Sequence, residues 1–454
     1  MAIVVIVVLL TSSVVSWCLL SLVAGRLSIL HAHPYAPFFY KSLATTLPGL
    51  VLTLALNPAV GYSSVLSSHG ATRAAQWLAY SLVAFPFGAI LSVVVWNRSL
   101  RYQFGLFSHQ TIVSNTSSSS ESPAKWHIRL SVLLVLLIAI VACYVYTHLP
   151  SIPLLVLTAS PDAIARARGA ATWGFLGNQY VLTVLGLTFV PLCDCVAFAL
   201  FLHYRTRLLK WLFCLSCLLT LLTVFYNGAK APPLDHIWSL YMVYVYAAGS
   251  KPSSKQLAVV ALLATMAMLL MFHFMMGVDF ASNFDIFHTG SMAARAVFGQ
   301  MQSLVAHFEV FPSVVPFQQW ASVAGFLSRQ QADTPARIVM KWMNPAGVEQ
   351  GKAGYAAAYY IGSAWADFGV AGVVLMPVLV GFLWTSLFVF VTRRWSPVRA
   401  GVLAYLAGWF GTQAQASGTR LLYFPELVLS IVLLLFCVLC ARRLPPSFKR
   451  RGIG

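Results

Sequence analysis

Residues 256–276 read QLAVVALLATMAMLLMFHFMM, and residues 277–300 continue GVDFASNFDIFHTGSMAARAVFGQ. The first run contains no Asp, Glu, Lys or Arg, and it is long enough to cross the roughly 30 Å hydrocarbon core of a bilayer as a helix. The second run opens a stretch, 277–355, that mixes charged residues with aromatic residues and prolines. This boundary predicts membrane-spanning helices that carry one large ordered loop.

The composition extends this interpretation to the whole chain. Of 454 residues, 59% are hydrophobic and 9% are charged, whereas a soluble domain has roughly 25% charged residues. Because backbone groups in hydrocarbon must be hydrogen-bonded within the protein, long apolar runs predict helices. We therefore predict an all-α polytopic integral membrane protein, built as a single membrane domain over residues 1–454. About eleven transmembrane helices are expected, at residues 2–24, 42–60, 74–97, 128–149, 180–203, 209–226, 234–248, 256–276, 366–391, 400–417 and 422–441.

The loops between these runs differ in charge. The formal net charge of +18 is spread over many short loops, which argues against a nucleic-acid partner and leaves the lipid bilayer as the expected one. One alternating set of loops is rich in Lys and Arg, includes Arg26 and Lys41, and contains a single acid, Glu121. The positive-inside rule places that set in the cytoplasm. The N-terminus is then outside, the C-terminus inside, and the 277–355 loop extracytoplasmic.

Three segments fall outside the predicted spans. Residues 98–127 contain the serine-rich run SNTSSSSESPA and are expected to form a flexible cytoplasmic loop. Residues 150–179 are expected to be an outer interfacial or re-entrant segment, in which Ser160 and Pro161 have the pattern of a helix start. Residues 277–355 are expected to be a large extracytoplasmic helical loop.

Basic residues recur on the outer side. They are Arg166, Arg168, Lys230, Arg295, Arg337, Lys341 and Arg420. Arg337 and Lys341 are four residues apart, so a helix places them on one face, which suits an anionic group such as a phosphate. Lys230 lies between Gly228 and a Pro-Pro pair, at the outer mouth of the membrane. The alternatives are local ion pairs, contact with lipid headgroups, or a solvated face.

Other titratable residues are sparse. Asp194 is the only acid that the sequence places well inside a span, where it could belong to a proton path or form a buried structural pair. Several histidines lie near the outer side, and any of them could act as a general base near neutral pH. None forms an H-x-x-x-H or H-E-x-x-H pattern, so no metal is expected.

Three patches of sequence carry a resemblance to a known family. They are PLLVLTASPDAIARARG with the following NQYVLTVLGLTFVPL, the turn YNGAKAPPL, and GYAAAYYIGSAWADFGVAGVVL after the long loop. With the overall layout, these patches resemble the Wzy-type O-antigen polymerases (oligosaccharide repeat-unit polymerases), which are related to O-antigen ligases. The family often has a Glu early in the third patch, and this chain has none there.

The resemblance implies glycosyl transfer at the outer face of the bacterial cytoplasmic (inner) membrane, by a multi-pass protein with a periplasmic active site. The donor would be a glycan on undecaprenyl diphosphate, and the acceptor a hydroxyl of a second lipid-linked repeat unit. No cofactor and no metal would be needed, and a chain-length-regulating co-polymerase is an expected partner.

The resemblance also gives roles to particular residues. The outer cations named above would bind the diphosphate. One of four residues would act as general base: Asp235, His236, Glu309 or His288. Five aromatic residues would stack on sugars, or else pack in the core: Trp320, Trp342, Tyr355, Tyr359 and Tyr360.

Two alternative functions remain open. One is an O-antigen ligase that transfers glycan to lipid A core, and the other is a lipid-linked oligosaccharide flippase or transporter. Transporters tend to contain internal repeats and to place ionisable residues at the membrane midplane. This sequence shows no internal repeat and places only Asp194 deep, so it favours the polymerase.

Overall fold

The computed structural model describes residues 2–24, 27, 33–56, 60–62, 65–97, 124–156, 159–248, 253–288, 290–319, 334–351, 353–415 and 421–443. Within these residues every regular element is a helix, which confirms the all-α prediction. Nine of the described helices are long and apolar enough to cross a membrane, so the chain is a multi-pass membrane protein.

These nine helices coincide with nine of the predicted spans. They are α1 (Ala2–Ala24), α2 (Ala36–Leu56), α3 (Ser68–Trp96), α5 (Lys125–Thr147), the continuous pair η5 (Val181–Phe189) and α7 (Val190–Tyr204), α8 (Arg207–Val224), α10 (Ser254–Met276), α15 (Tyr360–Val391) and α18 (Pro425–Arg443). The other two predicted spans are helices as well, α9 (Ala231–Ala248) and α16 (Pro397–Gln413). Asp235 and His236 make α9 polar, and α16 has only 17 residues, so the count of eleven spans stays a prediction.

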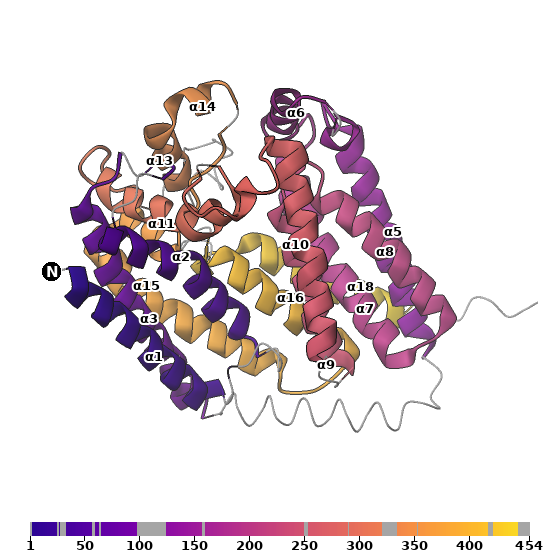
Figure 1. Cartoon of the computed structure of the whole chain (residues 1–454). Coiled ribbons are helices and arrows are strands. Elements are labelled where there is room, and N and C mark those ends of the chain that lie inside the picture. The colour runs from indigo at the N-terminus through magenta and orange to yellow at the C-terminus, as the bar shows by residue number, and fades with distance from the viewer. Residues whose placement is uncertain are drawn as a thin grey trace, which may run out of the picture.

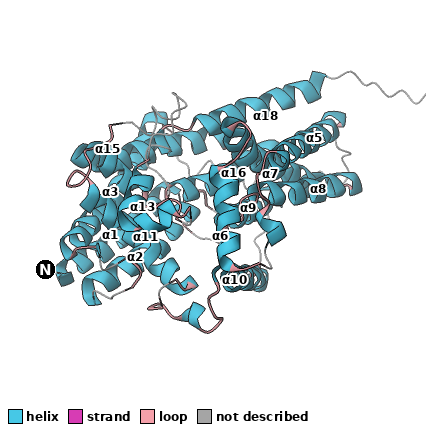
Figure 2. Ribbon diagram, turned by 90° about the horizontal axis from the view of Figure 1, so that it is seen from above, coloured by secondary structure: helices cyan, strands magenta, loops and turns pink. Residues whose placement is uncertain are grey.

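The helices form two groups joined by α16. Seen from above, α1, α2, α3, α11 and α15 lie on one side, and α5, α7, α8 and α18 on the other (Figure 2). Helix α16 packs against α9 and α7 and also against α2, so it joins the two groups. Helix α10 lies at the margin and contacts α6 and α11 (Figure 2). A site between the two groups is therefore held by several elements that are distant in sequence.

Small residues allow the closest helix contact. A Cβ atom on Gly88 of α3 would lie 2.0 Å from the carbonyl oxygen of Val378 in α15. A Cβ atom on Gly381 of α15 would lie 2.2 Å from the carbonyl oxygen of Phe85 in α3. Helices in a bilayer gain little from excluding water, so close backbone approach and dense packing are what hold such a pair together.

Short helices gather at one end of the bundle (Figure 1, top). They are η4 (Pro153–Val156), α6 (Pro161–Trp173), η6 (Ser282–Phe284), α13 (Pro335–Met343) and α14 (Pro345–Glu349), and the longer α11 (Met292–Val310) packs against η6 and α13 among them. The expected start of α6 is present: the Ser160 hydroxyl accepts a hydrogen bond from the backbone of Ala163, and Pro161 opens the helix. Most of the expected loop 98–127 lies outside the described residues, and its last three residues already belong to α5.

Helix α11 is more than part of a surface loop. Its residues 301–308 are all buried, and the helix packs against α2, α3 and α15. A Cβ atom on Gly49 of α2 would lie 2.1 Å from the carbonyl oxygen of Val297 in α11. The long polar stretch is therefore fixed to the membrane helices at its centre.

We expect Gly88→Ala to lower the thermal unfolding midpoint of the detergent-purified protein. The added methyl group has to displace the α15 backbone, and overpacking of this kind costs about 1–3 kcal/mol. Gly299→Ala is the matched control, because a Cβ atom there meets nothing within 4 Å and alanine favours a helix by about 0.5–1 kcal/mol. Equal midpoints for the two variants would contradict the tight α3–α15 contact.

Candidate functional site

Three basic side chains from three separate segments lie close together at α6. Arg168 comes from α6, Lys230 from the turn between α8 and α9, and Arg295 from the start of α11. Phe272 of α10 lies among them: the Lys230 Nζ atom is 3.3 Å and the Arg295 Cζ atom 5.7 Å from the centroid of its ring. The positive charge of Arg295 lowers the pKa of both Lys230 and Arg168, and the charge of Arg168 also lowers the pKa of Lys230. We call these three residues the cation cluster.

The turn before α9 fixes the position of Lys230. Gly228 has a φ of 67°, a left-handed conformation that glycine adopts without strain. The Asn227 side chain accepts a hydrogen bond from the backbone of Ala229 and donates one of 3.1 Å to the Thr172 hydroxyl. Because Thr172 lies on α6, this bond ties the Lys230 turn to the helix that carries Arg168.

The cation cluster has no carboxylate of its own in the described part of the chain. No Asp or Glu lies within 4.0 Å of its charged atoms there, and Arg168 Nε and Lys230 Nζ are buried without any hydrogen-bond partner. Buried charges are normally paired, because losing water around them is costly. The arrangement is therefore suited to binding an anion.

The electrostatics of Lys230 support this conclusion. Burial, and then the charges of Arg295 and Arg168, lower the pKa of its ammonium group from 10.5 to about 7. Burial also lowers the pKa of the Arg168 and Arg295 guanidinium groups below the usual value. A bound anion would favour the charged form of each group and raise these pKa values again.

A fourth cation, Arg337 of α13, packs against α6, the helix that carries Arg168. Its Cζ atom is 4.6 Å from the ring centroid of Trp173, which lies on α6 five residues after Arg168. Its guanidinium group donates hydrogen bonds of 2.9 and 2.7 Å to the carbonyl oxygens of Ala353 and Gly354. Arg337 thus holds the end of the long loop against α6, and it is less available to a ligand than the cluster.

The remaining predicted cations are less central. Arg166 and Lys341 are exposed on α6 and α13. Arg420 lies outside the described residues. Of the seven predicted cations, the structure therefore brings three together, with Arg168 and Lys230 half-buried and Arg295 exposed, and it places a fourth, Arg337, against another part of α6.

The four candidate bases have very different surroundings. Glu309 accepts hydrogen bonds from the backbone and the hydroxyl of Ser67, so it fixes the start of α3. His288 is exposed in the segment before α11. Asp235 forms an ion pair with Lys41, with 2.8 Å between Oδ1 and Nζ. His236 is buried, and its Nε2 atom is 2.8 Å from Oδ2 of Asp194.

The Lys41–Asp235 pair corrects the sequence interpretation. The sequence analysis placed Lys41 in a cytoplasmic loop and Lys230, five residues before Asp235, at the outer mouth of the membrane, and two groups 2.8 Å apart cannot lie on opposite sides. Lys41 is not in a loop, because α2 already begins at Ala36. Charge counting failed here because it treats every lysine beside an apolar run as a flank, whereas this one has a partner inside the bundle.

The structure also resolves the role of Asp194. Its carboxylate accepts hydrogen bonds from the ring of His236 and from the hydroxyl of Ser216, and all three side chains are buried. Asp194 is therefore part of a buried pair, one of the two alternatives that its position in a span left open. The three residues lie on α9, α7 and α8, so no local sequence pattern could have revealed their contact.

The predicted aromatic residues divide into two groups. Tyr359 and Tyr360 are 1% and 0% exposed, so they pack in the core and offer no ring face to a sugar. Tyr355 is 51% exposed and lies 5.3 Å from Trp173, centroid to centroid. Trp342 is half-buried on α13, and Trp320 lies outside the described residues. Trp173 was missed by the sequence analysis, because a residue five positions after Arg168 lies on a different face of the helix and its partners Arg337 and Tyr355 are distant in the chain.

No protein-family model, curated protein or solved structure matches this chain.

We expect binding of undecaprenyl diphosphate to the purified protein to weaken as the pH rises above about 7. Lys230 is then largely neutral in the free protein, so binding must include proton uptake, and each pH unit lowers the affinity by up to about tenfold. Titration calorimetry in nanodiscs at several pH values measures this slope. Lys230→Arg keeps the charge at every pH and should remove this part of the dependence, while the titration of the ligand itself affects both proteins equally.

The same group predicts a change in the stability of the free protein. The folded pKa of Lys230 lies below the unfolded value, so the unfolded chain binds more protons between about pH 7 and pH 10.5. Stability should therefore rise with pH over this window, and more in the natural protein than in Lys230→Met. Identical pH profiles for the two proteins would contradict a buried, unpaired Lys230.

Proposed function

We propose that this protein polymerises oligosaccharide repeat units linked to undecaprenyl diphosphate, at the outer face of a bacterial cytoplasmic membrane. The observation that carries the proposal is the cation cluster. Arg168, Lys230 and Arg295 converge at the end of the helix bundle without a described carboxylate, and two of their nitrogen atoms are buried without a partner. A lipid diphosphate supplies both the negative charge and the hydrogen-bond acceptors that this site needs.

The same cluster explains how the transfer would be assisted. In glycosyl transfer from a lipid diphosphate, the bond between the anomeric carbon and the diphosphate oxygen breaks, and negative charge grows on the leaving oxygen. Cations fixed in a partly desolvated site stabilise that charge without having to reorganise. The lipid would remain in the bilayer beside α10, whose apolar residues are largely exposed along most of its length.

The resemblance to repeat-unit polymerases gives the reaction its class. Two of the three patches on which it rests contribute directly to the cluster: SPDAIARARG carries Arg168, and YNGAKAPPL carries Lys230. The third patch continues from Tyr355, beside Trp173, into α15. Residues that carry the resemblance therefore meet at one place in the fold.

One observation favours a second candidate, a lipid-linked oligosaccharide flippase. The Asp194–His236 pair puts ionisable groups deep among the helices, where transporters often use them, and the half-buried Lys41–Asp235 pair also includes a residue of α9. A polymerase adds length to the glycan, whereas a flippase only changes the side of the membrane on which it lies. The length distribution of the product therefore separates the two functions.

The test uses the native host from which the gene has been deleted, with the protein supplied from a plasmid. We expect the natural protein to restore a ladder of glycan lengths on a gel. Transfer of single repeat units to lipid A core without a ladder would identify a ligase instead. Accumulation of unextended lipid-linked units on the inner leaflet after deletion would identify a flippase.

Two arginines of α6 provide a matched pair of variants in that assay. Arg168→Ala should reduce chain extension by about 10²- to 10³-fold, the usual effect of removing one group that stabilises a leaving oxygen. Arg166→Ala removes an equal charge from the exposed side of the same helix and should have a much smaller effect. Similar losses in both variants would mean that general surface charge, and not the cluster, binds the substrate.

A further inference from the structure

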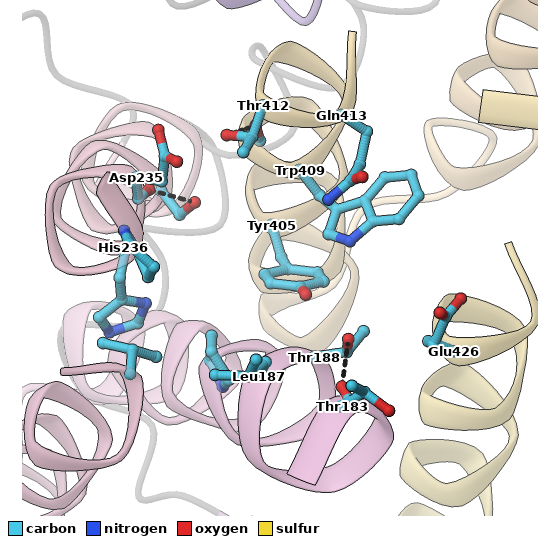
Figure 3. A pocket seen from close by; sticks show the side chains of 15 residues that line it. Thr183, Leu187, Thr188, Asp235, His236, Tyr405, Trp409, Thr412, Gln413 and Glu426 are labelled. Carbon is cyan, nitrogen blue, oxygen red and sulfur yellow. Dashed lines mark hydrogen bonds between the residues drawn. The ribbon is translucent and has the colours of Figure 1, made fainter. Parts of the chain in front are cut away.

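A cavity of about 220 Å³ lies between η5, α9, α16 and α18. Figure 3 shows Asp235 and His236 of α9 on one side of it, and Tyr405 of α16 and Glu426 of α18 on the others. A single water molecule needs only about 10–15 Å³, so the cavity accepts a larger group. The cavity lies next to the cation cluster in the chain, because Pro232, two residues after Lys230, forms part of its wall.

The cavity wall carries polar atoms that have no partner among the described residues. Nδ1 of His236 and Oε1 of Gln413 are both buried and make no hydrogen bond there. Such atoms are rare in folded proteins because each costs free energy, and at a cavity they indicate a polar ligand. Two threonine hydroxyls, those of Thr188 and Thr412, also line the cavity. The wall is thus suited to a ligand that carries several hydroxyl groups, as a sugar ring does.

The Asp194–His236 pair determines which ring nitrogen is reactive. The Asp194 carboxylate can only accept hydrogen bonds when ionised, and it accepts one from Ser216 and one from His236 Nε2. Nε2 therefore carries the ring proton, and Nδ1 has a free lone pair. A histidine that is held in one tautomer by a carboxylate, with its other nitrogen at a cavity, has the arrangement of a general base.

The spacing along α9 relates this base to the cluster. Helix α9 begins at Ala231, the residue after Lys230, and His236 lies five residues further on. At 1.5 Å per residue, the rise along the helix from Ala231 to His236 is about 8 Å. In a displacement at a sugar carbon, the attacking oxygen and the leaving oxygen lie on opposite sides of that carbon. The base and the phosphate-binding cations must therefore lie on opposite sides of the reacting centre, and the order of Lys230 and then His236 along one segment keeps them apart.

We propose that this cavity binds the terminal sugar of the acceptor repeat unit and that His236 is the general base of the transfer. This proposal rests on the proposed function. Nδ1 takes the proton from the acceptor hydroxyl while its oxygen forms the new bond to the anomeric carbon of the donor. The bond from that carbon to the diphosphate oxygen breaks, and its electron pair leaves with undecaprenyl diphosphate at the cation cluster. Asp194 acts as a positioning residue that stabilises the imidazolium form.

The other acids of the cavity are less suited to this role. Asp235 is engaged by Lys41, so its carboxylate is already neutralised. Glu426 lies in the first turn of α18, across the cavity from His236. Glu426 is better placed to accept a hydrogen bond from a sugar hydroxyl.

The experiment compares two quantities in the variants His236→Gln and Asp194→Asn. Chain extension is measured from the glycan ladder in the native host that lacks the gene, and ligand affinity is measured by calorimetry with undecaprenyl diphosphate in nanodiscs. We expect extension to fall by about 10²- to 10⁴-fold in both variants, which is the usual range for loss of general base catalysis. Affinity for undecaprenyl diphosphate should stay within about twofold, since the cluster is intact. His148→Gln, a histidine outside the cavity, is the control and should keep both properties.

The possible outcomes separate the two proposals. Full ladders from His236→Gln would overturn the assignment of the base and leave the polymerase intact. Loss of both extension and ligand affinity would also overturn it, because His236 would then be only structural. If the natural protein restores no ladder at all, the proposed function fails, and the acceptor site fails with it.

Discussion

A charge inside a membrane protein has to be matched, because removing it from water costs several kcal/mol that only a partner can offset. This constraint organises the interior of the molecule. Lys41 and Asp235 satisfy each other between α2 and α9, and Asp194 is satisfied by His236 and Ser216 between α7, α9 and α8. The first pair joins α2 to α9, and the second set joins α7 to α8 and α9, so both also help to fix how the helices pack.

The cation cluster is the exception to that rule, and the exception points to function. Evolution of a stable fold alone would not favour three neighbouring like charges, two of them over one phenylalanine ring, with two nitrogens left without acceptors. An anionic ligand would supply the missing negative charge and hydrogen-bond acceptors. Uncompensated charge that would destabilise a fold is common at binding sites. The lowered pKa of Lys230 is the measurable consequence of this uncompensated charge.

Much of the fold could be predicted from the sequence, because the apolar runs have the length that a bilayer requires. The cluster was partly predictable too: Arg168, Lys230 and Arg295 were each named, since a cation near hydrocarbon is conspicuous. That the three side chains meet was not predictable, because it depends on the Asn227–Thr172 bond and on how α10 and α11 pack.

The side of the membrane predicted for Lys41 was wrong, because its partner Asp235 is 194 residues away in the chain and charge counting considers only local sequence. Tyr359 and Tyr360 resemble ligand-binding aromatics in sequence, and only their burial shows that they pack the core.

Helix α9 links the two halves of the proposed chemistry. It begins directly after Lys230, it brings Asp235 to Lys41 of α2, and it brings His236 to Asp194 of α7. Because a helix is stiff, the separation between the phosphate-binding end and the base cannot vary much. Under the proposed function, the diphosphate of the donor and the hydroxyl of the acceptor would have to lie at a matching separation, as they would where the reacting ends of two lipid-linked glycans meet. The polar residues that make α9 a poor membrane span are, in this view, the same residues that give it a role in the reaction.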